Sequence, residues 1–329
     1  MSVTGSQVAD VPLRILAPRP TLPALAGAFA IAFSGILYRY ADVSPSTGAF
    51  FRCLYAVPPL LLLAWWEDRR LGGRPWRMRA WAWLAGAFFA ADLILWHRSI
   101  EYVGAGLATV LGNTQVVLVG VLAWLIYRER PATPLLVAIP VAMGGIVLIS
   151  GVLEDGAYGE DPVLGVVYGV LTGIAYTGFL LTLRHGSSDL RRMAGPLCDA
   201  TVAAALLTIP AGLAIGDLDL TPPLSAQGWL IVLALSSQVL GWLLITISLP
   251  RLPAVLTSVL LTLQPVLSVL FAAALLGESP SRLQLVGVAA ILSGLLLASA
   301  ARRGRDVAPA DGIGRGAAEQ REREQELVA

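Results

Sequence analysis

Apolar segments long enough to cross a membrane recur along the whole chain. A helix rises about 1.5 Å per residue, so about 20 apolar residues span the roughly 30 Å hydrocarbon core of a bilayer. The pattern predicts ten such helices, separated by joints that carry charges, Gly or Pro. Their expected bounds are 21–40, 48–66, 79–100, 105–126, 131–153, 162–184, 195–216, 226–248, 253–276 and 281–301. We therefore expect an all-α, polytopic membrane protein with ten transmembrane helices.

Composition supports a lipid environment. The chain has 329 residues, of which 56% are hydrophobic and 14% charged, and its mean hydropathy is +0.73. Soluble domains carry about 25% charged residues because they need a solvated surface. The net charge of +1 gives no reason to expect a nucleic-acid partner. The lipid bilayer is the expected surroundings of most of the surface.

Arginine is distributed unevenly between the two sets of loops. One set holds Arg14, Arg19, Arg69, Arg70, Arg74, Arg77, Arg79, Arg128, Arg130, Arg184, Arg191, Arg192, Arg251, Arg302, Arg303 and Arg305. The opposite set holds Arg39, Arg52, Arg98 and Arg282, together with acidic loops near 154–161 and 217–219. Since loops rich in Arg stay in the cytoplasm, both termini are expected there, with the chain in the cytoplasmic (inner) membrane.

The two ends are expected to lie outside the bilayer. Residues 1–20 do not resemble a cleaved signal peptide, because the apolar run after Arg19 is too long, and are expected to form a cytoplasmic segment. Residues 302–329 are rich in Ala, Gly, Arg and Glu and are expected to form a disordered cytoplasmic tail.

The two halves of the chain resemble each other. With a shift of 149 positions, Gln115-Val116-Val117-Leu118 aligns with Gln264-Pro265-Val266-Leu267, Glu129 with Glu278, and Gly145 with Gly294. Five expected helices separate the partners, and five is odd, so the second copy must be inverted in the membrane. Inverted repeats are common in secondary transporters. The predicted repeats are 21–153 and 162–301.

These motifs resemble a known family. The second half, with Gln264-Pro265, Gly277-Glu278-Ser279-Pro280 and Ser293-Gly294, resembles the second EamA repeat of the drug/metabolite transporter superfamily. The stretch from Asp92 through Asn113 to Tyr127-Arg128-Glu129-Arg130 is similar to the first. The first repeat departs from the second at Val116 and Ala138, which align with Pro265 and Gly287. The resemblance implies ten helices around a central cavity and the export or exchange of small metabolites or drugs.

Asp92 is the first candidate for chemistry. An ionisable residue inside a span costs a few kcal/mol and usually faces a cavity or a partner. Asp92 lies about eight residues, or ~12 Å, from the outer end of its helix, a depth that it shares with Asn113. Two interpretations stay open: a proton- or cation-binding group in the pathway, or a structural tie to Arg52 or Asn113.

Further polar and aromatic residues complete the candidate pathway. The expected substrate-pathway residues are Arg52, Asp92, Trp96, Asn113, Gln115, Tyr176, Gln238, Trp242 and Gln264. Tyr168, Thr172 and Tyr176 share one face of the sixth helix. Pro265 frees a backbone carbonyl near Gln264, either to bind substrate or as a packing kink. Facing aromatic and amide groups suit moderately apolar organic molecules.

Other features have structural interpretations. Gly165, Gly169 and Gly173 form a small-residue stripe that allows close helix packing. His97 is expected at the outer interface, hydrogen-bonded to water. Glu129 and Glu278 are expected to form salt bridges with neighbouring arginines. Cys53 and Cys198 show no metal spacing and no Walker A motif is present, so neither a metal, a cofactor nor an enzymatic activity is expected.

The leading hypothesis is a secondary transporter that moves a small metabolite or drug by alternating access. Export is the expected direction, and a proton is the candidate coupling ion. A channel-like facilitator is one alternative. An intramembrane enzyme is the other, but it would need a nucleophile–base or metal constellation at one depth. The sequence leaves the substrate and the oligomeric state open.

Overall fold

The computed structural model describes residues 21–127, 133–187, 189, 191–248 and 254–306, and it is helical with no strand over these residues. The helices are α1 (Thr21–Ala32), α2 (Ser34–Ala41), α3 (Pro45–Leu71), α4 (Trp76–Gly112), α5 (Gln115–Tyr127), α6 (Thr133–Ile149), α7 (Pro162–Gly186), α8 (Ala194–Ile215), α9 (Leu224–Leu233), the π-helix η2 (Ala234–Gly241), α10 (Trp242–Ser248), α11 (Ala254–Leu276) and α12 (Arg282–Asp306). The expected all-α class is confirmed.

Seven helical stretches of the described chain are long and apolar enough to cross a membrane. They are 21–41, 45–71, 76–119, 162–186, 194–215, 224–248 and 282–299, and the shorter apolar helices are 133–149 and 262–276. The stretch 76–119 covers two of the ten expected helices. It contains a break, since Gly104 has non-helical angles of φ 83° and ψ 167° inside α4. Chain reversal at one glycine therefore takes the place of the expected loop near 101–104.

Other boundaries also differ from expectation. α12 continues to Asp306, so residues 302–306 of the expected tail are helical, whereas 307–329 lie outside the described residues, as do 1–20 and Glu129. The π-helix η2 was not expected. It places Ser237 and Gln238 in a wider turn within the stretch 224–248. Wider turns of this kind often occur at functional sites.

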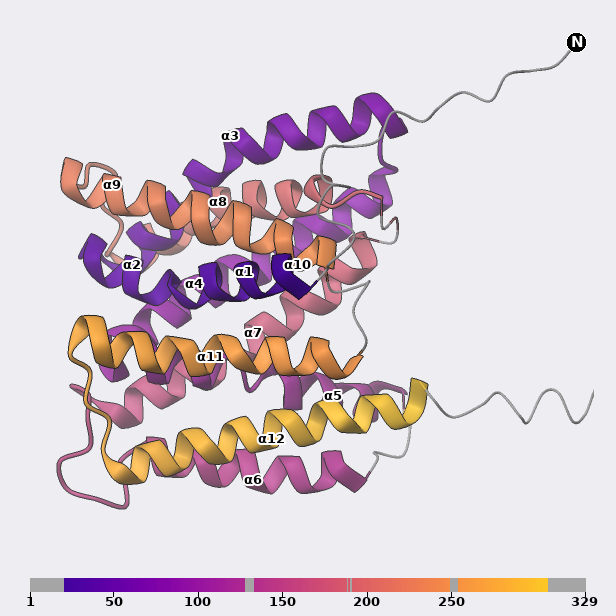
Figure 1. Ribbon diagram of the computed structural model, residues 1–329. Helices are drawn as coiled ribbons and strands as arrows, with labels where there is room; N and C mark the ends of the chain where they lie inside the picture. Colours follow the sequence, from indigo (N-terminus) through magenta and orange to yellow (C-terminus); the bar gives the residue numbers. More distant parts are fainter. Residues whose placement is uncertain (1–20, 128–132, 188, 190, 249–253, 307–329) are drawn as a thin grey trace, which may run out of the picture.

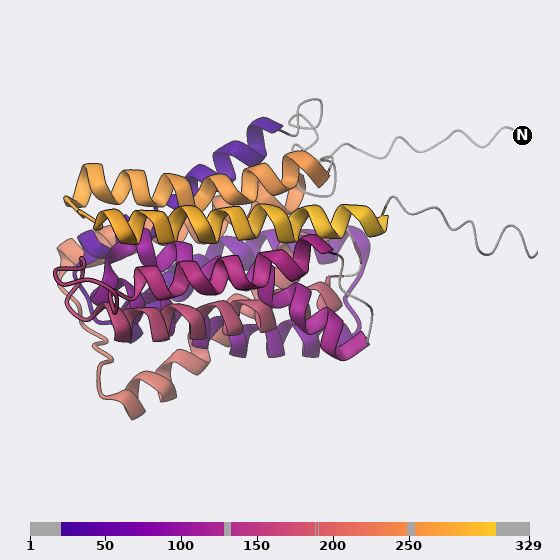
Figure 2. The same ribbon diagram turned by 90° about the horizontal axis from the view of Figure 1, so that it is seen from below.

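The helices run side by side in one bundle (Figures 1 and 2). α6 and α12 form one edge, α3 packs against α8, and α4 packs against α7 and α8 in the interior. The start of α1 and the end of α12 lie toward the same end of the bundle (Figure 1). The packing partners α3 and α8, like α6 and α12, come from different halves of the chain. The two halves are therefore interleaved rather than separate.

Glycine sets the closest helix crossings. The α7 stripe faces α4: a Cβ on Gly165 would lie 2.4 Å from Val103 Cγ1, and one on Gly169 would lie 2.6 Å from Leu111 Cβ. The third glycine of the stripe, Gly173, faces Thr114 in the same way. Each of these glycines lacks a side chain at a point where α4, or the turn after it, passes close to α7. The structural interpretation of the stripe is thus supported.

Two equivalent glycine contacts join α6 and α12. A Cβ on Gly145 would lie 2.7 Å from the Gly287 carbonyl oxygen, and a Cβ on Gly294 would lie 3.2 Å from the Ala138 carbonyl oxygen. A shift of 149 positions carries 145 to 294 and 138 to 287. The second contact is therefore the image of the first under the sequence repeat.

Candidate functional site

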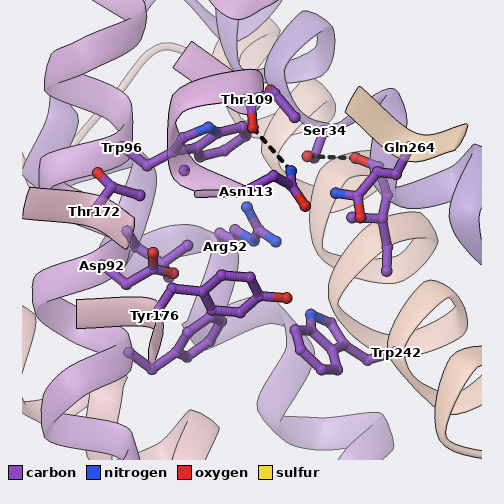
Figure 3. Close-up of a pocket in the computed structure, with 14 residues that line it drawn as sticks. Ser34, Arg52, Asp92, Trp96, Thr109, Asn113, Thr172, Tyr176, Trp242 and Gln264 are labelled. Carbon is purple, nitrogen blue, oxygen red and sulfur yellow. Dashed lines mark hydrogen bonds between the residues drawn. The ribbon is translucent and has the colours of Figure 1, made fainter. Parts of the chain in front are cut away.

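A buried cavity of about 70 Å³ lies where helices from both halves meet (Figure 3). Its lining residues come from α1, α2, α3, α4, α7, α10 and α11 and the turn after α4: Ile31, Ser34, Arg52, Phe89, Asp92, Leu93, Trp96, Thr109, Gly112, Asn113, Thr172, Tyr176, Trp242 and Gln264. The volume holds a few water molecules. Sites for organic ligands commonly measure about 300–1,000 Å³, so the space between these side chains is small.

Arg52 projects from α3 into the middle of this group and is 4% exposed. Its Nε donates a hydrogen bond to Gln238 Oε1 at 3.2 Å, and its guanidinium carbon lies 5.7 Å from the Trp96 ring centre. Gln238 Nε2 in turn donates to Thr201 Oγ1 at 3.3 Å. The π-helix η2 aims the Gln238 side chain at α3. This hydrogen bond fixes the Nε edge of the guanidinium, and the terminal nitrogens of the guanidinium face the cavity.

Asp92 on α4 faces the same cavity and is 8% exposed. Over the described residues, neither a hydrogen bond nor an ion pair within 4 Å joins its carboxylate to another group. It therefore lacks the direct tie to Arg52 or Asn113 that one interpretation required. Buried charges are costly unless they are paired or bind a ligand. The cavity brings together one cation and one anion that do not neutralise each other by direct contact.

Amide and hydroxyl groups form the wall opposite Asp92 (Figure 3). Asn113 Nδ2 donates to the Thr109 carbonyl at 2.8 Å, and Ser34 Oγ donates to the Ile31 carbonyl at 2.6 Å. Both bonds stay within their own helical segments, so the Asn113 Oδ1 and Gln264 amide groups are available toward the cavity. The wall offers polar groups without charge.

Aromatic rings close the remaining sides. Tyr176 and Trp242 meet edge to face with ring centres 6.3 Å apart, and Phe179 packs on Trp242 at 5.5 Å. Trp96 covers the opposite side (Figure 3). Such rings supply apolar area and also favour cations over their faces. The cavity therefore combines opposite charges with an apolar, aromatic surface.

The structure places most of the expected pathway residues together. Those that line the cavity are Arg52, Asp92, Trp96, Asn113, Tyr176, Trp242 and Gln264. Gln238 lies behind Arg52, and Gln115 is buried at the start of α5 without lining the cavity. Sequence reasoning missed Ser34 and Thr109, whose hydroxyls bond to backbone carbonyls three and four residues earlier and so give no distinguishing pattern.

Two further expectations are wrong. His97 is 0% exposed rather than interfacial: its Nδ1 lies 3.1 Å from the Pro45 carbonyl oxygen, and its ring stacks on Tyr38 with centres 3.9 Å apart. Glu278 forms no salt bridge with Arg282. Its carboxylate instead accepts hydrogen bonds from the backbone N–H groups of Ala105 and Gly106. In both cases the partner comes from another helix, which the local sequence does not show.

A cluster of charges joins the end of α3 to the starts of α4 and α8. Asp199 pairs with Arg74 at 2.8 Å and with Arg79 at 3.2 Å. Arg192 pairs with Asp68 at 2.7 Å. The described residues contain no group of three His, Cys, Asp or Glu side chains arranged to hold a metal ion. The charges at this end serve to join helices.

A bundle of apolar helices around a polar cavity is the architecture of a polytopic membrane protein. A model of the EamA-like transporter family matches residues 21–151 and again residues 163–300. The chain belongs to this family, and it is a multi-pass membrane protein.

Further comparisons bear on the fold. No curated protein matches the chain. Among solved structures, one titled only "Crystal structure of protein" is similar with a TM-score of 0.57 and 14% identity, covering 88% of this chain and 98% of that one. At this identity the likeness shows the fold alone.

Proposed function

We propose that the protein is a secondary transporter that exports a small metabolite or drug across the cytoplasmic membrane by alternating access, with a proton as coupling ion. Membership of a transporter family supports transport in general. The direction of transport is proposed from what the family resemblance implies, and the coupling ion and the class of solute are proposed from the cavity residues.

The proposed topology has ten crossings in two inverted halves, with both termini in the cytoplasm. The seven long helical stretches become eight when 76–119 is divided at Gly104, and the two shorter apolar helices, 133–149 and 262–276, bring the number to ten. The paired contacts Gly145–Gly287 and Ala138–Gly294 support a two-fold relation between the halves. The start of α1 and the end of α12 at one end of the bundle agree with an even count.

The observation that carries the proposal is the unpaired Arg52 and Asp92 at a cavity built from both halves. A static core would pair two such charges or replace them with apolar groups. A solute with a polar or charged head and an apolar body would meet both charges, the amides and the rings. Because both halves contribute walls, rocking of one half against the other would change access to these groups.

The size and chemistry of the cavity favour a carrier over the two alternatives. A channel-like facilitator needs a continuous path across the membrane, whereas this cavity measures only about 70 Å³. An intramembrane enzyme needs a nucleophile and base in contact. Asp92 makes no such contact, and His97 packs instead against Tyr38 and Pro45.

Counterflow in proteoliposomes tests the proposal. Thermal-shift screening of the purified protein against amino acids, nucleobases and cationic drugs would first select a ligand. Vesicles loaded with that ligand should then accumulate its labelled form transiently, and an imposed pH gradient should change the rate. Asp92→Asn should abolish accumulation. Entry of label without stimulation by internal ligand would favour a facilitator, and insensitivity to the pH gradient would remove the proton.

A further inference from the structure

The last part of α4, residues 105–112, is a short helix that follows a break in α4. Gly104 before it has φ 83° and ψ 167°, and Asn113 and Thr114 form a hydrogen-bonded turn after it. This half-helix carries Thr109 and Gly112 of the cavity wall. A change of angles at Gly104 would tilt the half-helix and move its part of the wall.

Glu278 holds the start of this half-helix. Its Oε1 accepts from the Ala105 N–H at 2.6 Å and its Oε2 from the Gly106 N–H at 3.1 Å. Free N–H groups and the helix dipole make a helix start a favourable place for a carboxylate. A Cβ on Gly104 would lie 2.6 Å from Glu278 Cδ, and its φ is positive, so two separate reasons require glycine at this position.

α11, from the other half of the chain, presents this carboxylate. After α11 ends, Gly277 adopts φ 69°, and the Glu278 N–H then bonds to the Ala272 carbonyl at 3.2 Å. A Cβ on Gly106 would lie 3.0 Å from Val269 Cα of α11. The Glu278 residue is 6% exposed. One half of the molecule therefore contacts this element of the other half both by close packing of α11 and through the buried Glu278 carboxylate.

A second cavity, of about 310 Å³, is lined by Gly104, directly before the residues that Glu278 holds. We name it the vestibule; its lining residues are Arg39, Ile100, Glu101, Tyr102, Gly104, Tyr158, Gly159 and Glu160. The vestibule and the central cavity share no lining residue. Along α4, Gly104 lines the vestibule and Thr109 lines the cavity. The contacts of Glu278 with Ala105 and Gly106 fall between these two positions.

We propose that Glu278 is the latch that separates the central cavity from the vestibule by holding residues 105–112 in place. As a step of the transport cycle proposed above, release of the carboxylate frees the half-helix to tilt about Gly104. The two cavities then become continuous. While the latch is closed, two buried N–H groups are paired with a charged acceptor, a stronger bond than a neutral one. Glu278 is thus a positioning residue, which acts on the site through the helix that it holds.

Thiol accessibility tests the latch without any need for a transported solute. Cys53 and Cys198 are the two cysteines of the chain and are both buried. In a Cys53→Ala, Cys198→Ala background, Ser34→Cys places a reporter on the cavity wall, beside the half-helix. The reporter is labelled with a membrane-impermeant methanethiosulfonate, on intact cells and on inside-out vesicles. Glu278→Gln should raise the labelling rate at least tenfold from the face that carries the vestibule.

Glu101→Gln is the matched control, because Glu101 lines the same vestibule but pairs with Arg98 at 3.7 Å rather than with backbone N–H groups. It should leave the labelling rate unchanged. An unchanged rate in Glu278→Gln would overturn the latch. So would an equal rise in Glu101→Gln, or an equal rise from both faces, which would indicate general loosening.

Ala105→Pro approaches the latch from the other side. Proline removes one N–H donor, is tolerated at the first position of a helix, and follows a residue, Gly104, whose ψ of 167° suits it. It should reproduce the one-sided rise. If neither Ala105→Pro nor Glu278→Gln yields folded membrane protein, Glu278 acts in folding and the latch is overturned. A one-sided rise without counterflow of any solute would support the latch while the transport proposal fails.

Discussion

Two groups of buried charges in this molecule differ in whether the charges form direct ion pairs. At one end of the bundle, Asp199 has both Arg74 and Arg79 within 3.2 Å. In the central cavity, Asp92 and Arg52 are equally buried, yet no direct ion pair joins them. Paired charges fix helices relative to each other, whereas unpaired charges at a cavity are available to a ligand. The difference separates the part of the molecule in which charges join helices from the part that we propose to bind solute.

The largest expected effect on stability is at the paired site. Asp199→Asn leaves Arg74, whose side chain is 6% exposed, without its ion partner. Loss of one partner of a buried pair costs about 3–5 kcal/mol. Thermal unfolding of the purified protein should show a large fall in Tm. Asp155→Asn is the control and should leave Tm unchanged, because Asp155 is exposed and makes no ion pair or side-chain hydrogen bond over the described residues. Equal Tm values for both variants would contradict the role of Asp199 as a buried, paired charge that stabilises the bundle.

The unpaired site should respond in activity rather than in stability. Asp92→Asn removes a charge that has no direct partner, so Tm should stay the same or rise. Counterflow should fall at least tenfold, because the variant no longer offers an anion to the solute or proton. A fall in Tm comparable with that of Asp199→Asn would show that Asp92 is a structural charge after all.

The crossing of α6 and α12 gives an intermediate effect and a neighbouring control. Gly145→Ala places a Cβ 2.7 Å from a carbonyl oxygen of α12, and such overpacking costs about 1–3 kcal/mol. Gly144→Ala meets nothing within 4 Å, so the change should be neutral or stabilise the helix by up to about 1 kcal/mol. Chemical denaturation of the two variants would measure the difference. If both behave alike, the crossing is looser than the structure has it.

Arg52→Lys refines the role of the cavity cation. Lysine keeps the charge but cannot reproduce the Nε bond to Gln238 beside a free guanidinium edge. Loss of a hydrogen bond of about 1–2 kcal/mol predicts a roughly tenfold rise in KM with little change in kcat. A change confined to kcat would instead place Arg52 in the conformational step.

The smallest expected effect is a pH dependence of the latch. Burial raises the pKa of Glu278, opposed by the N–H groups of Ala105 and Gly106 and by Arg39. Arg39 and Tyr158 are the described ionisable groups that interact with it, from α2 and from the segment before α7, and Glu101 and Glu160 share the vestibule. As pH falls through the raised pKa, the latch loses its charge and labelling of the Ser34→Cys reporter should increase.

The direction of the pH effect distinguishes opening of the latch from unfolding of the protein. A carboxyl whose pKa is raised in the folded state favours folding at low pH, and this contribution is lost as pH rises through that pKa. Opening at low pH therefore cannot be unfolding driven by Glu278. The Glu278→Gln variant should show no such pH dependence, and a dependence that survives in it would belong to another group.

The sequence alone determined the membrane setting, the helical class, the repeat and most cavity residues. Lipid accepts only chain segments whose backbone is satisfied internally, so each span must be a long apolar helix, and this pattern is local. A charge such as Asp92 inside a span is costly and is therefore conspicuous. The shift of 149 residues required comparison of the chain only with itself.

Tertiary structure decided which of these groups meet. Arg52 is held by Gln238, 186 positions away, through a π-helix that no local pattern indicated. Glu278 caps a helix break at Gly104, rather than pairing with Arg282, and His97 is buried against Tyr38. Helical periodicity assigns a residue to a face of its own helix. The rotation and depth at which distant helices pack, which set these partners, depend on the shapes of both surfaces at once.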